Sequence, residues 1–166
     1  MHIKTKSHIT PFLQQSKTEY KEIGDITFTD VWGPAWTTGI RGECYYVSFT
    51  DGATQHTQIH FMKKKDVLRH IKDYQAFIKT QTSKNLKAMQ FNGGGEYINH
   101  KVINYLKSCG IWYEITAAHS PAQNGIAECL NCTLIKHTHA MMLEHNISYF
   151  LWPEAVCQHL KSDDQN

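Results

Sequence analysis

Arginine is scarce in this 166-residue sequence. Of its 17 basic side chains, only Arg41 and Arg69 are arginine, and the rest are lysine. Arginine is the better partner for phosphates and base edges, because its planar group makes paired hydrogen bonds. The formal net charge of +2 is also too small to indicate nucleic-acid binding by itself. Composition alone therefore gives little support to a nucleic-acid partner.

The sequence also lacks long apolar runs and evenly paired cysteines. No stretch approaches the roughly 20 apolar residues of a membrane span, and the first residues lack the apolar core of a signal peptide. We therefore expect an intracellular, reducing setting and no membrane partner. The five cysteines are an odd number at irregular spacing, which argues against a disulfide framework. Cys129 and Cys132 form a C-x-x-C, but on one continuous helix we expect ordinary thiols rather than zinc ligands.

What the sequence does contain is the pattern of one α/β domain. Hydrophobic residues make up 41% and charged residues 19%, as in ordinary globular proteins. Alternating or β-branched and aromatic residues predict five strands, at 26–31, 44–50, 54–62, 86–91 and 111–115. Helical periodicity predicts helices at 66–82 and 97–108, from Ile126 onward and from Trp152. Three strands joined by tight turns and two joined through helices indicate a mixed five-stranded sheet with flanking helices.

Large side chains on the predicted strands are expected in the core rather than on the surface as base-stacking platforms. These residues are Phe28, Trp32, Tyr46, Trp112 and Ile115. Between the second and third strands, Asp51 and Gly52 signal a hairpin turn. Asp66 precedes the first predicted helix and is expected to be its N-cap.

Two polar residues mark an expected ligand site. Asp30 and Asn92 stand at the ends of the first and fourth predicted strands. Side chains at the carboxyl ends of neighbouring strands in an open sheet converge on one crevice. Three glycines follow Asn92, where the backbone must turn sharply or lie close to another group. We therefore expect Asp30 and Asn92 to share a site.

Three segments resemble one family in order and spacing. Residues 29–34 (TDVWGP) resemble the D-x-x-G-P that opens copia-type retrotransposon integrase cores. Residues 92–97 (NGGGEY) resemble the family's D-N-G-G-E-Y, and 120–128 (SPAQNGIAE) its P-x-x-Q-N-G-x-x-E. Positions 92 and 128 are separated by 35 residues, the interval that gives this superfamily its acidic-triad name. The chain is identified as a member of the copia-type integrases.

The resemblance implies a ribonuclease-H-like fold and phosphoryl transfer that joins DNA 3′ ends to target DNA with two Mg²⁺ or Mn²⁺ ions. It places Asp30 on both ions, position 92 on one and Glu128 on the other. Position 92 is Asn here, where the family has Asp. An amide oxygen can coordinate a metal but offsets none of its charge. We therefore expect Asp30, Asn92 and Glu128 to form a weakened metal site, and catalysis to be lost or impaired.

Other departures from the family point the same way. Positions that usually carry arginine hold Gln90, Cys129, Cys132 and His139. A cluster of such changes suggests mutational decay of a silenced element. By the same resemblance, residues 25–159 are the catalytic core, 1–24 a linker or leader without zinc-module ligands, and 160–166 a divergent tail.

Four residues are candidates for contacts with DNA. Gln123 and Asn124 lie in a predicted polar loop before the helix that carries Glu128. Asn131 follows Glu128 by three residues and shares its helix face, and Lys136 lies two turns along. The resemblance implies retroelement ends and target DNA as partners, self-association, a nuclear location if the copy functions, and no small-molecule substrate.

Two alternatives stay open. One alternative to a decayed integrase core is a domesticated, non-catalytic DNA-binding or interaction module. The other is a weak residual nuclease that uses Asp30, Glu128 and a metal held by Asn92. The first alternative predicts a retained basic surface together with lost acids. Because cations are lost here as well, the sequence favours a decayed integrase core.

Overall fold

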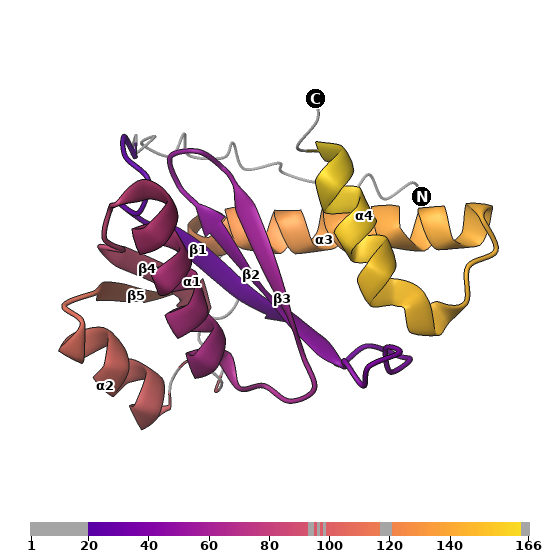
Figure 1. Cartoon of the computed structure of the whole chain (residues 1–166), viewed down its shortest axis with the longest axis horizontal. Coiled ribbons are helices and arrows are strands. Elements are labelled where there is room, and N and C mark those ends of the chain that lie inside the picture. The colour runs from indigo at the N-terminus through magenta and orange to yellow at the C-terminus, as the bar shows by residue number, and fades with distance from the viewer. Residues whose placement is uncertain (1–19, 93–94, 96, 98, 117–120, 164–166) are drawn as a thin grey trace, which may run out of the picture.

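A computed structural model describes residues 20–92, 95, 97, 99–116 and 121–163, with the side chains of 92, 121–128 and 161–163 outside that description. Its centre is one sheet of five strands in the order β3-β2-β1-β4-β5 (Figure 1). The strands are β1 (Thr27–Trp32), β2 (Tyr45–Asp51), β3 (Thr57–Met62), β4 (Ala88–Asn92) and β5 (Trp112–Thr116). β1, β2 and β3 run antiparallel, while β4 and β5 lie parallel to β1. The predicted mixed sheet is confirmed.

Helices cover both faces of this sheet. On one face lie α1 (Val67–Thr82) and α2 (His100–Ser108), and on the other α3 (Pro121–Glu144) and α4 (Trp152–Asp163), with the short η1 (Tyr149–Leu151) before α4. Figure 1 shows α1 in front of the strands and α3 crossing behind them. Among the described residues, every helix is too short or too polar to serve as a membrane span.

Alternation along β2 sends its side chains into two different clusters of the core. Val47 and Phe49 point toward α1, whereas Tyr46 points toward α3 and α4. The predicted apolar side of α1 is confirmed, since it buries Val67, Ile71, Tyr74 and Ile78. The second cluster joins Tyr46 to buried residues of α3 and α4. These residues are Leu134, Met142, Trp152, Ala155 and Val156.

Two of the five expected core side chains are exposed. Phe28 and Tyr46 are buried, and Trp32 is half-buried and stacked on Tyr46 with ring centroids 5.3 Å apart. Trp112 is 60% exposed and Ile115 41% exposed. Both lie on β5, which is an edge strand with β4 as its only neighbour in the sheet. The strand pattern predicted the strand correctly, but it could not show that the helices leave this edge partly uncovered.

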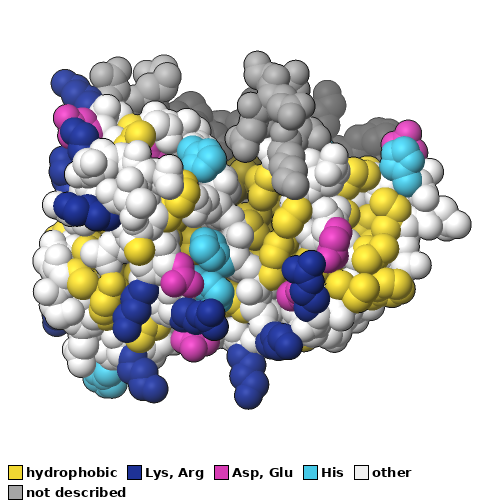
Figure 2. Space-filling model, viewed as in Figure 1, with side chains coloured by type: hydrophobic (Ala, Val, Ile, Leu, Met, Phe, Trp, Pro, Cys, Tyr) yellow, Lys and Arg dark blue, Asp and Glu magenta, His cyan; other side chains and the backbone are white. Residues whose placement is uncertain are grey.

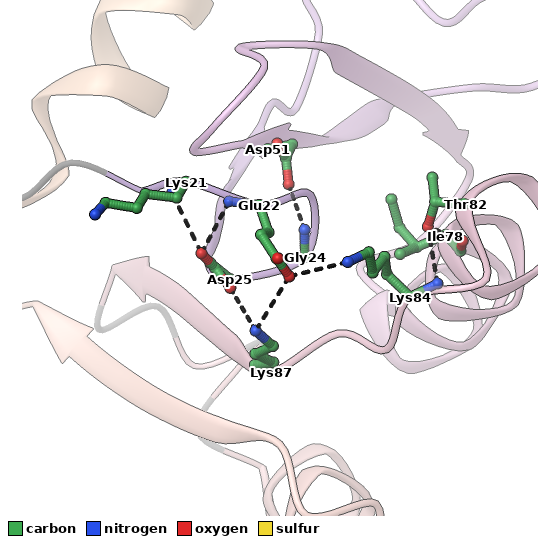
Figure 3. Close-up of polar contacts among 9 residues, drawn as sticks. All are labelled: Lys21, Glu22, Gly24, Asp25, Asp51, Ile78, Thr82, Lys84 and Lys87. Atoms are coloured by element: carbon green, nitrogen blue, oxygen red, sulfur yellow. Dashed lines mark hydrogen bonds and ion pairs between the residues drawn. The ribbon is translucent and has the colours of Figure 1, made fainter.

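The expected boundaries also shift. Residues 20–24 were assigned to a linker, yet Tyr20 packs edge-on against Phe28 at 5.9 Å and Gly24 N–H donates to Asp51 at 2.8 Å. Figure 3 shows this segment tied to the domain, with the Lys87 ammonium 2.7 Å from Asp25. That hydrogen bond lowers the pKa of the Asp25 carboxyl. At the other end, α4 continues to Asp163, into the segment expected to be a tail.

The expected loop at 117–125 is partly helical. Residues 117–120 lie outside the described part of the chain, but α3 begins at Pro121 and includes Gln123, Asn124 and Gly125. Proline suits the first turn of a helix, because its missing N–H would have no helical partner there. Asn124 and Gly125 favour turns in isolation, and this local preference is overridden here.

The Asp51 carboxylate stabilises the β2–β3 turn by hydrogen bonds and also binds the backbone at the start of the described chain. This buried carboxylate accepts hydrogen bonds from the N–H groups of Gly24, Ala53 and Thr54 and from the Thr54 hydroxyl, at 2.8 to 3.1 Å. Asp66, by contrast, stands at the N-cap of α1 without a capping hydrogen bond from its side chain. The turn signal in the sequence is therefore confirmed, while the cap expected of Asp66 is absent.

Replacing Asp51 by alanine is expected to destabilise the domain by about 2 kcal/mol, because the substitution leaves the buried N–H of Gly24 unpaired and removes the hydrogen bonds of the β2–β3 turn. Asp66→Ala is the matched control, since the same chemical change there removes no capping bond. Urea denaturation of the two variants and the native chain measures the difference. Equal stability of the two variants would contradict the role given to Asp51.

Candidate active site

Asp30 lies at the centre of the sheet and faces α3. It is 8% exposed, in the middle of β1, and pairs with Ser48 of β2. Its neighbour Thr29 faces the opposite side, where its hydroxyl lies 2.9 Å from that of Tyr97. The Asp30 carboxylate oxygen Oδ2 accepts a hydrogen bond of 2.8 Å from the amide nitrogen of Asn131 on α3. The alternation of β1 therefore aims this acid at the helix that carries Glu128.

Position 92 lies beside Asp30 in the sheet. β1 and β4 are parallel, and Thr29 pairs with Phe91, so residues 30 and 92 are the next positions along the two strands. Hydrogen-bonded strands are about 4.8 Å apart. The backbone of Asn92 also pairs with Thr116 of β5, and its side chain lies outside the described part of the structure.

The third position comes from α3, which contacts β1, β2 and β4. Residue 128 lies in this helix, three residues before Asn131. Residues three apart share one face of a helix, separated by about one turn. Position 128 therefore lies one turn from the residue that touches Asp30. The Glu128 side chain, like those of Gln123 and Asn124, is outside the description.

Asn131 has a different role from the DNA contact expected of it. Its side chain is 5% exposed and bridges two buried groups. Its amide nitrogen donates to Asp30, and its amide oxygen accepts a hydrogen bond of 3.1 Å from the hydroxyl of Tyr46. A side chain buried in this way has no surface to offer a DNA phosphate. Asn131 instead fixes the orientation of the Asp30 carboxylate.

Tyr46 is a component of this site that the sequence did not reveal. Burial, and secondarily the nearby charge of Asp30, raises the pKa of the Tyr46 phenol far above its usual value. Tyr46 therefore stays protonated and remains a donor to Asn131. Its aromatic position on a strand indicated only a core residue, because the polar link depends on β2, α3 and β1 meeting in space.

Among the α3 candidates whose side chains are described, Lys136 remains for contact with DNA. Lys136 is exposed, as a contact with DNA requires. Cys129 and Cys132 are free, exposed thiols on the same helix. Gln90, another position where the family usually has arginine, is 6% exposed on β4. The structure therefore retains Lys136 as a DNA-contact candidate.

Known proteins are similar to this chain in sequence and in fold, although no protein-family model matches it. The retrovirus-related Pol polyprotein from transposon TNT 1-94 of Nicotiana tabacum is 31% identical over 152 residues, which are 91% of this chain and 11% of that protein. The Ty1-DR6 Gag-Pol polyprotein of Saccharomyces cerevisiae is 28% identical over 131 residues, 77% of this chain and 8% of the polyprotein. The chain thus spans about a tenth of these relatives.

Two solved structures are similar to the chain in fold. The HTLV-2 integrase catalytic core domain, solved with magnesium in a trimeric form, superposes with a TM-score of 0.57 at 13% identity, over 82% of both chains. The simian T-cell lymphotropic virus intasome, solved with a PP2A regulatory subunit, gives 0.64 at 12% identity over 86% of this chain and 49% of that one.

The chain matches a retrotransposon integrase core in its sequence relatives and in its fold. Its ribonuclease-H-like fold and its sequence relatives agree on this, and the prediction from the three motifs is confirmed. At 12–13% identity the solved structures establish the fold alone. In this chain, Asp30 and residue 92 lie side by side on β1 and β4, and residue 128 lies on α3, which contacts both strands.

Proposed function

We propose that this integrase core performs metal-dependent DNA strand transfer at the site around Asp30, and that its catalysis is weak because position 92 is asparagine. The proposal rests chiefly on the convergence of three positions. Asp30 on β1, residue 92 beside it on β4, and the α3 turn that holds residue 128 meet at one place. These are the positions that carry the acidic metal ligands in the family that the sequence resembles.

The donor set suits a hard divalent cation. Asp30 and Glu128 supply carboxylates and Asn92 an amide oxygen, and oxygen donors are what Mg²⁺ and Mn²⁺ prefer. Such ions, when bound, stabilise the attacking and the leaving oxygen of phosphoryl transfer. The hydrogen bond from Asn131 holds the Asp30 carboxylate in a fixed orientation. Because Asn92 contributes no negative charge, metal binding is weaker than with three carboxylates.

A nicking and strand-transfer assay on the native chain tests this function. With Mg²⁺ or Mn²⁺ and DNA carrying retroelement ends, we expect slow joining that Glu128→Gln abolishes. DNA binding without cutting, both in the native chain and after Asn92→Asp, would instead indicate a non-catalytic binding module. Joining at the same rate in the native chain and in Asn92→Asp would contradict the proposed impairment.

DNA is the proposed partner of this chain, and we expect Lys136 to contact a DNA phosphate. Each phosphate neutralised by a cation releases bound counterions, so losing one contact weakens binding and makes it less sensitive to salt. We expect Lys136→Ala to lower affinity for DNA about fivefold and to reduce the slope of log K against log salt by about 1. Lys101→Ala on α2, across the sheet, is the control. Fluorescence anisotropy at several salt concentrations measures both, and identical slopes for the two variants would exclude Lys136.

Self-association is part of the same proposal. The HTLV-2 integrase core was solved in a trimeric form, and this chain exposes large apolar side chains at Ile40, Tyr149 and Phe150. They lie together, because Ile40 N–H donates to the carbonyl of Phe150 at 3.0 Å. Light scattering with and without DNA ends tests the idea, and the mass of a single chain under both conditions would contradict it.

A further inference from the structure

Three side chains of metal-binding type lie together away from the active site, on the face of the sheet that α1 covers. His60 on β3 pairs with Val47, which belongs to the core cluster under α1. His70 and Asp73 lie on α1, one turn apart, and therefore share a face of that helix. One ligand atom from each of the three residues lies within 4.8 Å of the other two. Figure 2 shows histidine side chains beside acidic ones on this face.

The two imidazoles are held close together before any ion binds. Both are half-buried, and their ring centroids are 5.2 Å apart. Phe49 packs edge-on against His60, with centroids 5.6 Å apart, which limits rotation of that ring. Because a metal ligand must be in place for binding to be strong, this fixed pair is suited to hold an ion.

One ring nitrogen of His70 has no hydrogen-bond partner among the described residues. This atom, Nδ1, is buried. Buried polar atoms of folded proteins are nearly always paired, so this nitrogen calls for an explanation. An ion bound to this nitrogen would supply the missing partner.

We propose that His60, His70 and Asp73 form a zinc-binding site that joins β3 to α1. Two imidazole nitrogens and one carboxylate oxygen are a ligand set that suits Zn²⁺, with the fourth position left to solvent. Asp73 is free to complete the site, because its side chain is 54% exposed and its ion pair with Arg69 is a weak surface contact of 3.9 Å. Rotation of this side chain moves its carboxylate relative to the two imidazoles, and the zinc ion would draw the three ligand atoms to tetrahedral spacing.

The site is independent of the strand-transfer site. Its ligands come from β3 and α1, while Asp30 faces α3 across the sheet. A bound zinc ion cross-links β3, an edge strand of the sheet, to a helix, and its binding energy adds to the stability of the folded chain. The role inferred is therefore structural, and it holds whether or not the chain transfers DNA strands.

Zinc titration of the native, reduced chain tests the proposal, with long-range ¹H–¹⁵N spectra of the imidazoles as the readout. We expect the ring resonances of His60 and His70 to shift with one equivalent of Zn²⁺, and the melting temperature to rise. His70→Gln and Asp73→Asn should each weaken zinc binding at least about tenfold by calorimetry. Because the spectra read the ligands directly, the result does not depend on whether the variants fold.

His137→Gln is the matched control, since His137 and His159 form another close imidazole pair, with ring nitrogens 3.2 Å apart. It should leave the shifts of His60 and His70 and the zinc affinity unchanged. Zinc that moves only the resonances of His137 and His159, or that moves none, would overturn the proposal. So would a folded His70→Gln variant with native affinity.

Discussion

Replacing Asn92 by aspartate is expected to raise Mg²⁺-dependent strand transfer by about 100-fold, which corresponds to ~2.7 kcal/mol of activation free energy. The backbone of residue 92 already lies beside Asp30, so the substitution adds a carboxylate without moving the chain. The added charge strengthens metal binding, because anionic oxygen ligands offset the charge of a dication. The rate of joining of labelled DNA ends, measured over a range of Mg²⁺ concentrations, tests this.

The control for that experiment is the double variant Asn92→Asp with Glu128→Gln, which should be silent. If the double variant is as active as Asn92→Asp, residue 128 is not a metal ligand and the assignment of the site fails. If Asn92→Asp is folded and inactive, the defect lies beyond position 92. Cys129 and Cys132, both exposed on α3 where the family that the sequence resembles usually has arginine, are then the next positions to replace by arginine.

Replacing Asn131 is expected to have the second largest effect. Asn131→Ala leaves the Asp30 carboxylate and the Tyr46 hydroxyl without their shared partner, at a cost of about 3 kcal/mol in unfolding free energy. Measured in the Asn92→Asp background, strand transfer should also fall by about 10- to 100-fold, because the carboxylate loses the group that orients it. Denaturation and the joining assay give the two numbers separately.

Asn131→Asp separates this account from simple loss of packing. It places a second carboxylate against Asp30, so the pair shares a proton and the folded-state pKa of that proton rises above its unfolded value. A group with a raised folded pKa stabilises the fold at low pH and loses that contribution as pH rises. The variant should therefore be least stable near neutral pH and recover toward pH 5, and this recovery should be larger than in Asn131→Ala, which leaves one carboxylate there rather than two.

Thr133→Ala, an exposed change on the same helix, is the control for both Asn131 variants. It should alter neither stability nor joining beyond about 0.5 kcal/mol. If Asn131→Ala has the same unfolding free energy and joining rate as Thr133→Ala, the hydrogen bonds from Tyr46 to Asn131 and from Asn131 to Asp30 contribute neither to stability nor to strand transfer.

The zinc site and the active site differ in how the sequence could have revealed them. The active site is carried by three local motifs whose spacing is visible in the chain. The ligands of the zinc site are His60 and, ten residues later, a His-x-x-Asp, which by itself matches many solvent-exposed helices. Only the packing of α1 on β3 brings them within reach of one ion.

The sequence by itself determined the elements of this fold and the family. Strand and helix periodicities are local, so five strands and the buried side of α1 could be predicted from neighbouring residues. The motifs at Asp30, Asn92 and Glu128 indicated where ligands would converge, and the parallel pairing of β1 with β4 places residues 30 and 92 side by side.

Tertiary structure alone decided what each surface faces. Asn131 shares a helix face with Glu128, but its burial against Asp30 depends on a contact between residues 101 positions apart. Trp112 and Ile115 follow the pattern of core strands, yet they are exposed because β5 is an edge. Periodicity states which side chains point the same way. What covers that side is set by the packing of distant elements, and a local pattern carries no information about it.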